Sequence, residues 1–298
     1  MRSAISKYMR RFSTSSLAYE FDLNGFAVLR NVFDESQVKT MNSAIDGKVP
    51  VEREGEALKN AKSGSYFDAK GSRMDLGGCM LWEETDVFRD ILVAPRVTEL
   101  LDLVVGKEHR LDHEPLILIQ QKDSEGFKLH GGPMLDDDGL NPELQYRTAN
   151  GKIFNSLVAL FVALTPSNGR NDGGLSLLRG SHKSSFATPS GYIHGEDNSH
   201  REFLDEHLYT PSLNPGDVVV FSEATVHGAR PWRAEHERRV VLLRFSPRNF
   251  AYGRSIEVPK NLTPEQAKLF REPYSARLDN REKEKLDHDN KVFGHEYF

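Results

Sequence analysis

Short apolar runs bounded by turn-forming residues constrain the fold of this chain more than any other feature. They occupy residues 115–121, 153–164, 173–178, 216–222 and 238–245, and each is rich in Val, Ile, Leu or Phe. Glycine, proline, asparagine or aspartate stands at their ends, as is typical of β-strands. No regular helical pattern separates the runs, so we predict a mainly β protein, an antiparallel sandwich or barrel.

Helices are predicted on both sides of this strand-rich region. A strand around Phe26 is followed by Asp34 and Gln37, which have the spacing of a capping box that opens a helix. A second helical stretch covers residues 86–106 and should be kinked or broken before Pro95, because proline lacks a backbone donor. Thr263 begins another capping box near the C-terminal end. We therefore expect flanking N- and C-terminal helices around a β core.

Length and composition exclude several classes of protein. The 298 residues suffice for one domain with a full core. A net charge of −5 without a basic stripe argues against a nucleic-acid partner. Cys79 is the single cysteine, which excludes an internal disulfide framework and a cysteine-cluster zinc site. No apolar run approaches the roughly 20 residues of a membrane-spanning helix.

The first residues have the composition of a mitochondrial transit peptide. Residues 1–18 carry four basic side chains and several serines, and no acid occurs before Glu20. We predict a leader over 1–18 and the folded domain over 19–298. The alternative is a disordered basic tail on a cytoplasmic protein.

Two of the eleven histidines stand at strand ends, where side chains can converge on one metal ion. His130 precedes two glycines, and His227 follows the run at 216–222. Imidazole is a common ligand of iron, although either histidine alone could be an ordinary turn or core residue. Arg238, eleven residues after His227, could bind a carboxylate or pair with a surface acid. Its neighbour Arg239 should point to the opposite face of the strand.

The order of these motifs resembles the phytanoyl-CoA dioxygenase family. The similar stretches are "NGFAVLRNVF", "NDGGLSLLRGSHKSSF", "NPGDVVVFSEATVHGARPW" and "RRVVLLRFSP". The resemblance implies a double-stranded β-helix (jelly-roll) enzyme that uses Fe(II), 2-oxoglutarate and O2. It also implies that His130 and His227 bind the metal and that Arg238 anchors 2-oxoglutarate. Gln120 and Asn155 are weaker candidates for cosubstrate contacts.

Gly132 departs from the family pattern, because an acidic metal ligand is expected two residues after the first histidine. A surrogate acid, either Asp136 with its neighbours 137 and 138 or Glu223, would give a hydroxylase. Halide in the vacant position would give a halogenase, and loss of the metal would leave a non-catalytic binding protein. Ala229 likewise replaces a hydroxyl side chain that the family uses to contact the cosubstrate.

The substrate is expected to be a small organic molecule. Arginines cluster around His227, at positions 230, 233, 238, 239, 244 and 248. They are consistent with an anionic substrate, or with exposed side chains paired to nearby acids. The acidic stretch at 133–151 is long enough to form a lid. The sequence does not indicate an oligomeric state.

Overall fold

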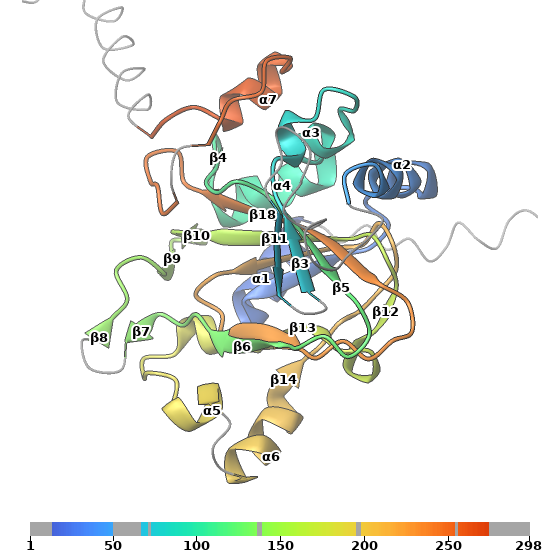
Figure 1. The fold of residues 1–298 in the computed structure, drawn as a ribbon. Coiled ribbons are helices and arrows are strands. Elements are labelled where there is room, and N and C mark those ends of the chain that lie inside the picture. The colour runs from blue at the N-terminus through green and yellow to red at the C-terminus, as the bar shows by residue number, and fades with distance from the viewer. Residues whose placement is uncertain are drawn as a thin grey trace, which may run out of the picture.

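A computed structural model describes residues 14–49, 67–70, 73–135, 139–194, 198–253 and 256–273. Two antiparallel sheets face each other, as Figure 1 shows. In order, the large sheet contains β1 (Phe26–Leu29), β16 (Val218–Ser222), β11 (Val158–Ala163), β18 (Arg238–Ser246), β5 (Leu116–Gln120), β3 (Arg73–Leu76) and β2 (Phe67–Lys70), and β4 (Arg110–Leu111) pairs with β18. The small sheet contains β14 (Leu208–Tyr209), β13 (Gly174–Leu178), β17 (His227–Arg230) and β6 (Phe127–His130). This is the predicted jelly-roll architecture.

Three two-stranded ribbons extend from the sheets. They pair β9 (Tyr146–Ala149) with β10 (Lys152–Asn155), β7 (Met134–Leu135) with β8 (Gly139–Leu140), and β12 (Ser167–Asn168) with β15 (Ser212–Leu213). The helices are α1 (Thr14–Asn24), α2 (Glu35–Asp46), α3 (Val87–Ile91), α4 (Pro95–Val104), α5 (Ser190–His194), α6 (Asn198–His207) and α7 (Pro264–Leu269). None of the helices in these described ranges is long and apolar enough to cross a membrane.

Alternating side chains of the large sheet fill two separate cores. On β18, Val241 and Leu243 belong to the core shared with α2, α3 and α4, whereas Val240 and Leu242 face the small sheet. Because both faces are covered, the strand β11 is buried along its whole length. Burial on both faces explains why the sequence shows nearly continuous apolar runs rather than an alternation of apolar and polar residues.

The predicted helix starts are confirmed. Asp34 and Gln37 form a capping box at α2, and Thr263 forms the equivalent box with Gln266 at α7. The stretch at 86–106 divides into α3 and α4, and Pro95 is the first residue of α4. Proline fits this position because the first helical N–H has no acceptor within the helix.

One strand boundary differs from expectation. The run at 153–164 contains the end of β10 and the separate strand β11. His227, predicted at a strand end, follows β16 and opens β17. Helix α1 begins at Thr14, inside the predicted leader of residues 1–18. Residues 1–13 of that leader lie outside the described residues. The stretch at 133–151 contains the hairpin β7–β8 and the strand β9.

Candidate active site

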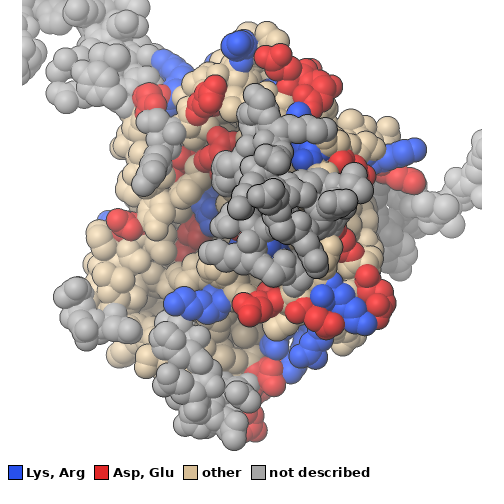
Figure 2. All heavy atoms as spheres, viewed as in Figure 1, with Lys and Arg blue, Asp and Glu red and all other residues tan. Residues whose placement is uncertain are grey.

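A cavity of about 250 Å³ lies between the inner faces of the two sheets. Apolar walls come from both sheets, and the polar side chains that reach it are Arg73, Gln120, His130, His227, Arg238 and Arg244. On the face shown in Figure 2, basic and acidic side chains are interspersed, and both signs also appear in a recess left of the centre. A largely apolar cavity with a few convergent polar groups is the usual form of a small-molecule site.

His130 and His227 are brought together by strand pairing. They are direct partners across β6 and β17, and their ring centroids lie 4.1 Å apart. The Nδ1 atom of His130 lies 3.0 Å from the carbonyl oxygen of Lys128, and that of His227 lies 2.7 Å from the carbonyl oxygen of Thr225. Donation of the Nδ1 proton to a carbonyl leaves each Nε2 with a free lone pair, as metal-binding histidines require.

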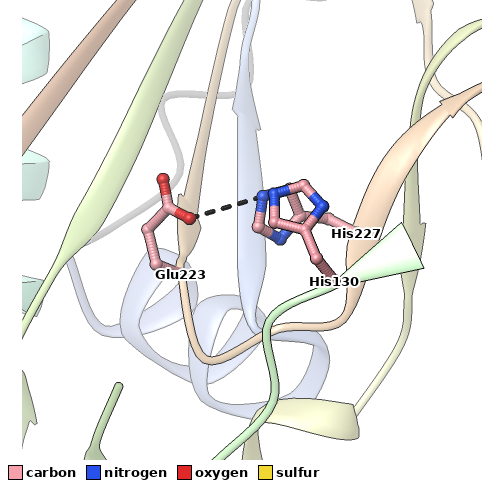
Figure 3. A group of neighbouring side chains, drawn as sticks. All are labelled: His130, Glu223 and His227. Atoms are coloured by element: carbon pink, nitrogen blue, oxygen red, sulfur yellow. Dashed lines mark ion pairs between the residues drawn. The ribbon is translucent and has the colours of Figure 1, made fainter. Parts of the chain in front are cut away.

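Glu223 is the acidic side chain beside this histidine pair. The ligand atoms of His130, Glu223 and His227 all lie within 4.8 Å of one another (Figure 3). Glu223 Oε2 is 3.4 Å from His227 Nε2, while Glu223 Oε1 accepts a bond of 2.5 Å from Arg244 Nε. Atoms about 2.1 Å from a common ion stand roughly 3–4 Å apart, so this set could hold a divalent metal.

The protonation states also suit a metal. Burial lowers the pKa of His227 to about 4, so its imidazole is neutral at pH 7. Burial by itself favours the protonated form of Glu223, but the charged Arg244 guanidinium, which donates to Oε1, holds the pKa of this carboxyl below its usual value. Metal ions bind deprotonated ligands, and a carboxylate together with histidine imidazoles is a donor set suited to iron(II).

A tight turn at residues 223–226 joins β16 to β17; Glu223 begins this turn and His227 follows it as the first residue of β17. The Thr225 hydroxyl donates to the carbonyl of Gly25, and the Val226 N–H donates to Ser181 Oγ at 2.8 Å. A Cβ on Gly131 would stand only 2.7 Å from the carbonyl oxygen of Glu223. The close approach of the β6 end to this turn therefore requires glycine at position 131.

Gly132 occupies the position where the family pattern has an acid. Its φ is +102°, a backbone conformation that residues with a side chain rarely adopt. The chain at this point is therefore shaped for glycine. Of the two surrogate acids, the structure brings Glu223 to the histidines, whereas Asp136, with 137 and 138, lies outside the described residues.

Arg238 faces the cavity from β18, and Arg239 faces the opposite side, where it pairs with Glu237 and Asp46. Arg238 Nη1 donates to Gln120 Oε1 at 2.5 Å, so both predicted side chains line one wall. Burial and the nearby Arg73 lower the pKa of Arg238 to about 10, and it stays charged at pH 7. Such a buried guanidinium is suited to binding a carboxylate.

Asn155 requires a correction, since the structure does not bring it to the cavity. Its amide donates to the carbonyl of Val104 in α4 at 2.6 Å, on the outer side of the large sheet. The residue ends β10, not the buried strand β11, so its side chain fastens the ribbon to the helix.

Sequence reasoning missed the role of two arginines. Arg73 lines the cavity from β3 and lies over the ring of Phe127, 5.2 Å from its centroid. Arg244 was predicted only as one of a cluster around His227. Pairing between strands that are far apart in the sequence brings both side chains to the cavity. No local sequence motif predicts this placement.

Comparisons with known proteins agree with this description. The family model described as phytanoyl-CoA dioxygenase matches residues 21–240. A dioxygenase named lolE1, from Epichloe uncinata, is 26% identical over 186 residues, which are 62% of this chain and 64% of that protein. The match thus spans less than two thirds of the length of that relative.

Solved structures share the fold. HygX from Streptomyces hygroscopicus, with nickel and 2-oxoglutarate bound, has a TM-score of 0.66 and 24% identity, covering 83% of this chain and 92% of HygX. The epimerase SnoN, in complex with Fe3+, alpha ketoglutarate and nogalamycin RO, has a TM-score of 0.54 and 16% identity, covering 81% of this chain and 86% of SnoN. At these identities the likeness establishes the architecture.

Proposed function

Because the chain belongs to the phytanoyl-CoA dioxygenase family, we propose that it is a non-haem iron(II)- and 2-oxoglutarate-dependent dioxygenase that hydroxylates a small organic substrate. One observation carries the proposal: His130, Glu223 and His227 converge beside a cavity that also contains Arg238. Bound iron(II), with 2-oxoglutarate and O2, would supply the oxidation of a C–H bond to an alcohol as 2-oxoglutarate becomes succinate and carbon dioxide.

The protein's own groups bind and orient the reactants. His130, Glu223 and His227 would hold the metal, and the carbonyls of Lys128 and Thr225 fix the two imidazole rings. Arg238 would bind the distal carboxylate of 2-oxoglutarate, and Gln120 holds its guanidinium in place. Leucine and phenylalanine side chains on both walls give the rest of the cavity an apolar lining, suited to the hydrocarbon part of a small organic substrate.

Halogenation is the second candidate function. It is favoured by Gly132, because glycine stands where the family pattern has an acidic metal ligand. A halogenase needs a ligand position left open for halide. In this protein the Glu223 carboxylate stands beside the histidines and would fill that position. Glu223 therefore supports hydroxylation over halogenation.

The test is an anaerobic titration of the protein with iron(II) and 2-oxoglutarate, with and without chloride, that follows the visible absorption band of the chelate. We expect a band that chloride does not change, loss of the band in His227→Ala, and weakened iron binding in Glu223→Ala. A band that requires chloride and survives in Glu223→Ala would support the halogenase instead. No band under any condition would contradict both activities and favour a binding protein.

A further inference from the structure

Arg244 is a cavity-lining arginine on the same strand as Arg238 and on the same face, six residues further along β18. At about 3.3 Å per residue the two positions are roughly 20 Å apart along the strand. Arg244 contacts Glu223, the acid of the metal-ligand set, whereas Arg238 contacts Gln120. The two arginines therefore serve different parts of the cavity.

The two oxygens of the Glu223 carboxylate have different partners. Oε1 accepts the 2.5 Å bond from Arg244 Nε, and Oε2 faces His227 Nε2 at 3.4 Å. The side chain of Glu223 is only 6% exposed, so water does not compete freely for either oxygen. Because Arg244 uses the oxygen that is turned away from His227, it need not be displaced when a metal binds Oε2.

We infer that Arg244 is a positioning residue: it fixes the Glu223 carboxylate so that Oε2 is turned toward His227, where it would bind a metal held by His130 and His227. This inference rests on the proposed function, in which Glu223 is the third ligand. Glutamate has one more rotatable bond than the aspartate of the family pattern, so its carboxylate needs an additional contact to keep one orientation. A guanidinium, with its donors in a rigid planar arrangement, supplies such a contact.

The alternative is that Arg244 only neutralises the buried charge of Glu223. In that case any cation would serve equally well, and a bound metal would itself compensate the carboxylate. Removal of Arg244 would then leave metal affinity unchanged or raise it. The two roles therefore predict different results: only positioning predicts that the loss of the Arg244 contact weakens metal binding.

The experiment compares Arg244→Lys with the unmodified protein by anaerobic calorimetric titration with iron(II). Lysine keeps the positive charge but loses the fixed direction of the Nε–H donor. Positioning predicts a roughly 10- to 100-fold weaker affinity for iron, the range seen when the partners of metal ligands are removed. It also predicts a shifted or weakened absorption band of the iron and 2-oxoglutarate chelate. Unchanged or tighter iron binding in Arg244→Lys would overturn the inference.

Arg239→Lys is the matched control, because Arg239 is also ion-paired on β18 but faces away from the cavity. It should change neither the affinity nor the band. The double variant Glu223→Ala with Arg244→Met leaves no unpaired charge, so folding should be preserved. It should bind iron no more weakly than Glu223→Ala alone, since Arg244 acts through Glu223; a further loss would contradict the inference.

These variants separate the inference from the proposed function. If Glu223→Ala binds iron with unchanged affinity, Glu223 is not a ligand and the proposed ligand set fails. If Glu223→Ala weakens binding while Arg244→Lys does not, only the role of Arg244 is wrong.

Discussion

The two glycines that follow His130 both have a positive φ, but only Gly131 is also constrained by a close contact. A Cβ on Gly131 would meet the backbone of the turn between Glu223 and His227. A Cβ on Gly132 would meet only side-chain atoms, at 3.5 Å or more, so its constraint lies in the backbone angle. The position of the missing family acid therefore has a backbone shape suited to glycine, and in the proposed site Glu223 would supply the acidic ligand instead.

A pair of alanine substitutions distinguishes these two constraints. Gly131→Ala should lower both the stability of the fold and the affinity for iron(II), because the turn must move. Gly132→Ala should cost about 1–3 kcal/mol of unfolding free energy for the strained backbone, with a smaller effect on iron. Urea unfolding and iron titration of both variants measure the difference. Equal loss of iron affinity in the two would contradict the distinction.

His182 makes stability depend on pH. Burial lowers its pKa to about 4, against about 6.5 in the unfolded chain. The unfolded state therefore binds a proton first as the pH falls, and stability is lost between about pH 6.5 and 4. Across this range the unfolding free energy should fall by about 3 kcal/mol.

We expect His182→Gln to flatten the pH dependence of the unfolding midpoint between about pH 6.5 and 4. The exposed His236→Gln should keep the original slope, and equal slopes in both variants would refute the prediction.

At the scale of elements, the turn between β16 and β17 depends on a contact from a distant segment. Ser181 lies in the short helical turn Ser181–Lys183, and its hydroxyl accepts from Val226 N–H and donates to the carbonyl of Leu178 at 2.7 Å. This hydroxyl therefore joins the end of β13 to the turn between Glu223 and His227.

Ser181→Ala should leave the buried N–H of Val226 without its acceptor. The expected loss is about 1–3 kcal/mol in unfolding free energy, together with weaker iron binding because the turn becomes less fixed. Ser184→Ala is the control, since among the described residues its hydroxyl bonds to the backbone of Phe186, in an exposed loop away from the turn. Urea unfolding and iron titration of both variants test this. A Ser181 variant with unchanged iron affinity would mean that the turn is held without it.

Elements whose signals are local were predictable from the sequence. The capping boxes at Asp34 and Thr263 and the break before Pro95 depend on neighbouring residues, and all three are confirmed. The pairing of β6 with β17, which places His130 opposite His227, joins segments about a hundred residues apart. No pattern within either segment encodes that pairing, so the resemblance to a family, rather than periodicity, indicated the histidine pair. Arg73 carried no signal of either kind.

At the scale of the whole molecule, the candidate ligand positions join the two sheets. His130 and His227 belong to the small sheet, whereas Arg238 and Gln120 belong to the large sheet. The two sheets also contact each other where Arg73, on β3 of the large sheet, lies over the ring of Phe127, on β6 of the small sheet. A metal on the small sheet that is chelated by a cosubstrate held on the large sheet would therefore link the two layers.

Ligand binding should consequently stabilise the fold in two separable steps. A ligand at 100 times its Kd adds about 2.7 kcal/mol to the unfolding free energy. Iron(II) should raise the anaerobic thermal midpoint of the unmodified protein and of Arg238→Ala alike, since the metal ligands are intact in both. Added 2-oxoglutarate should raise the thermal midpoint further only in proteins that retain Arg238. The control Arg239→Ala should therefore behave like the unmodified protein. If 2-oxoglutarate stabilises Arg238→Ala as strongly, the cosubstrate is anchored elsewhere and does not link the sheets through β18.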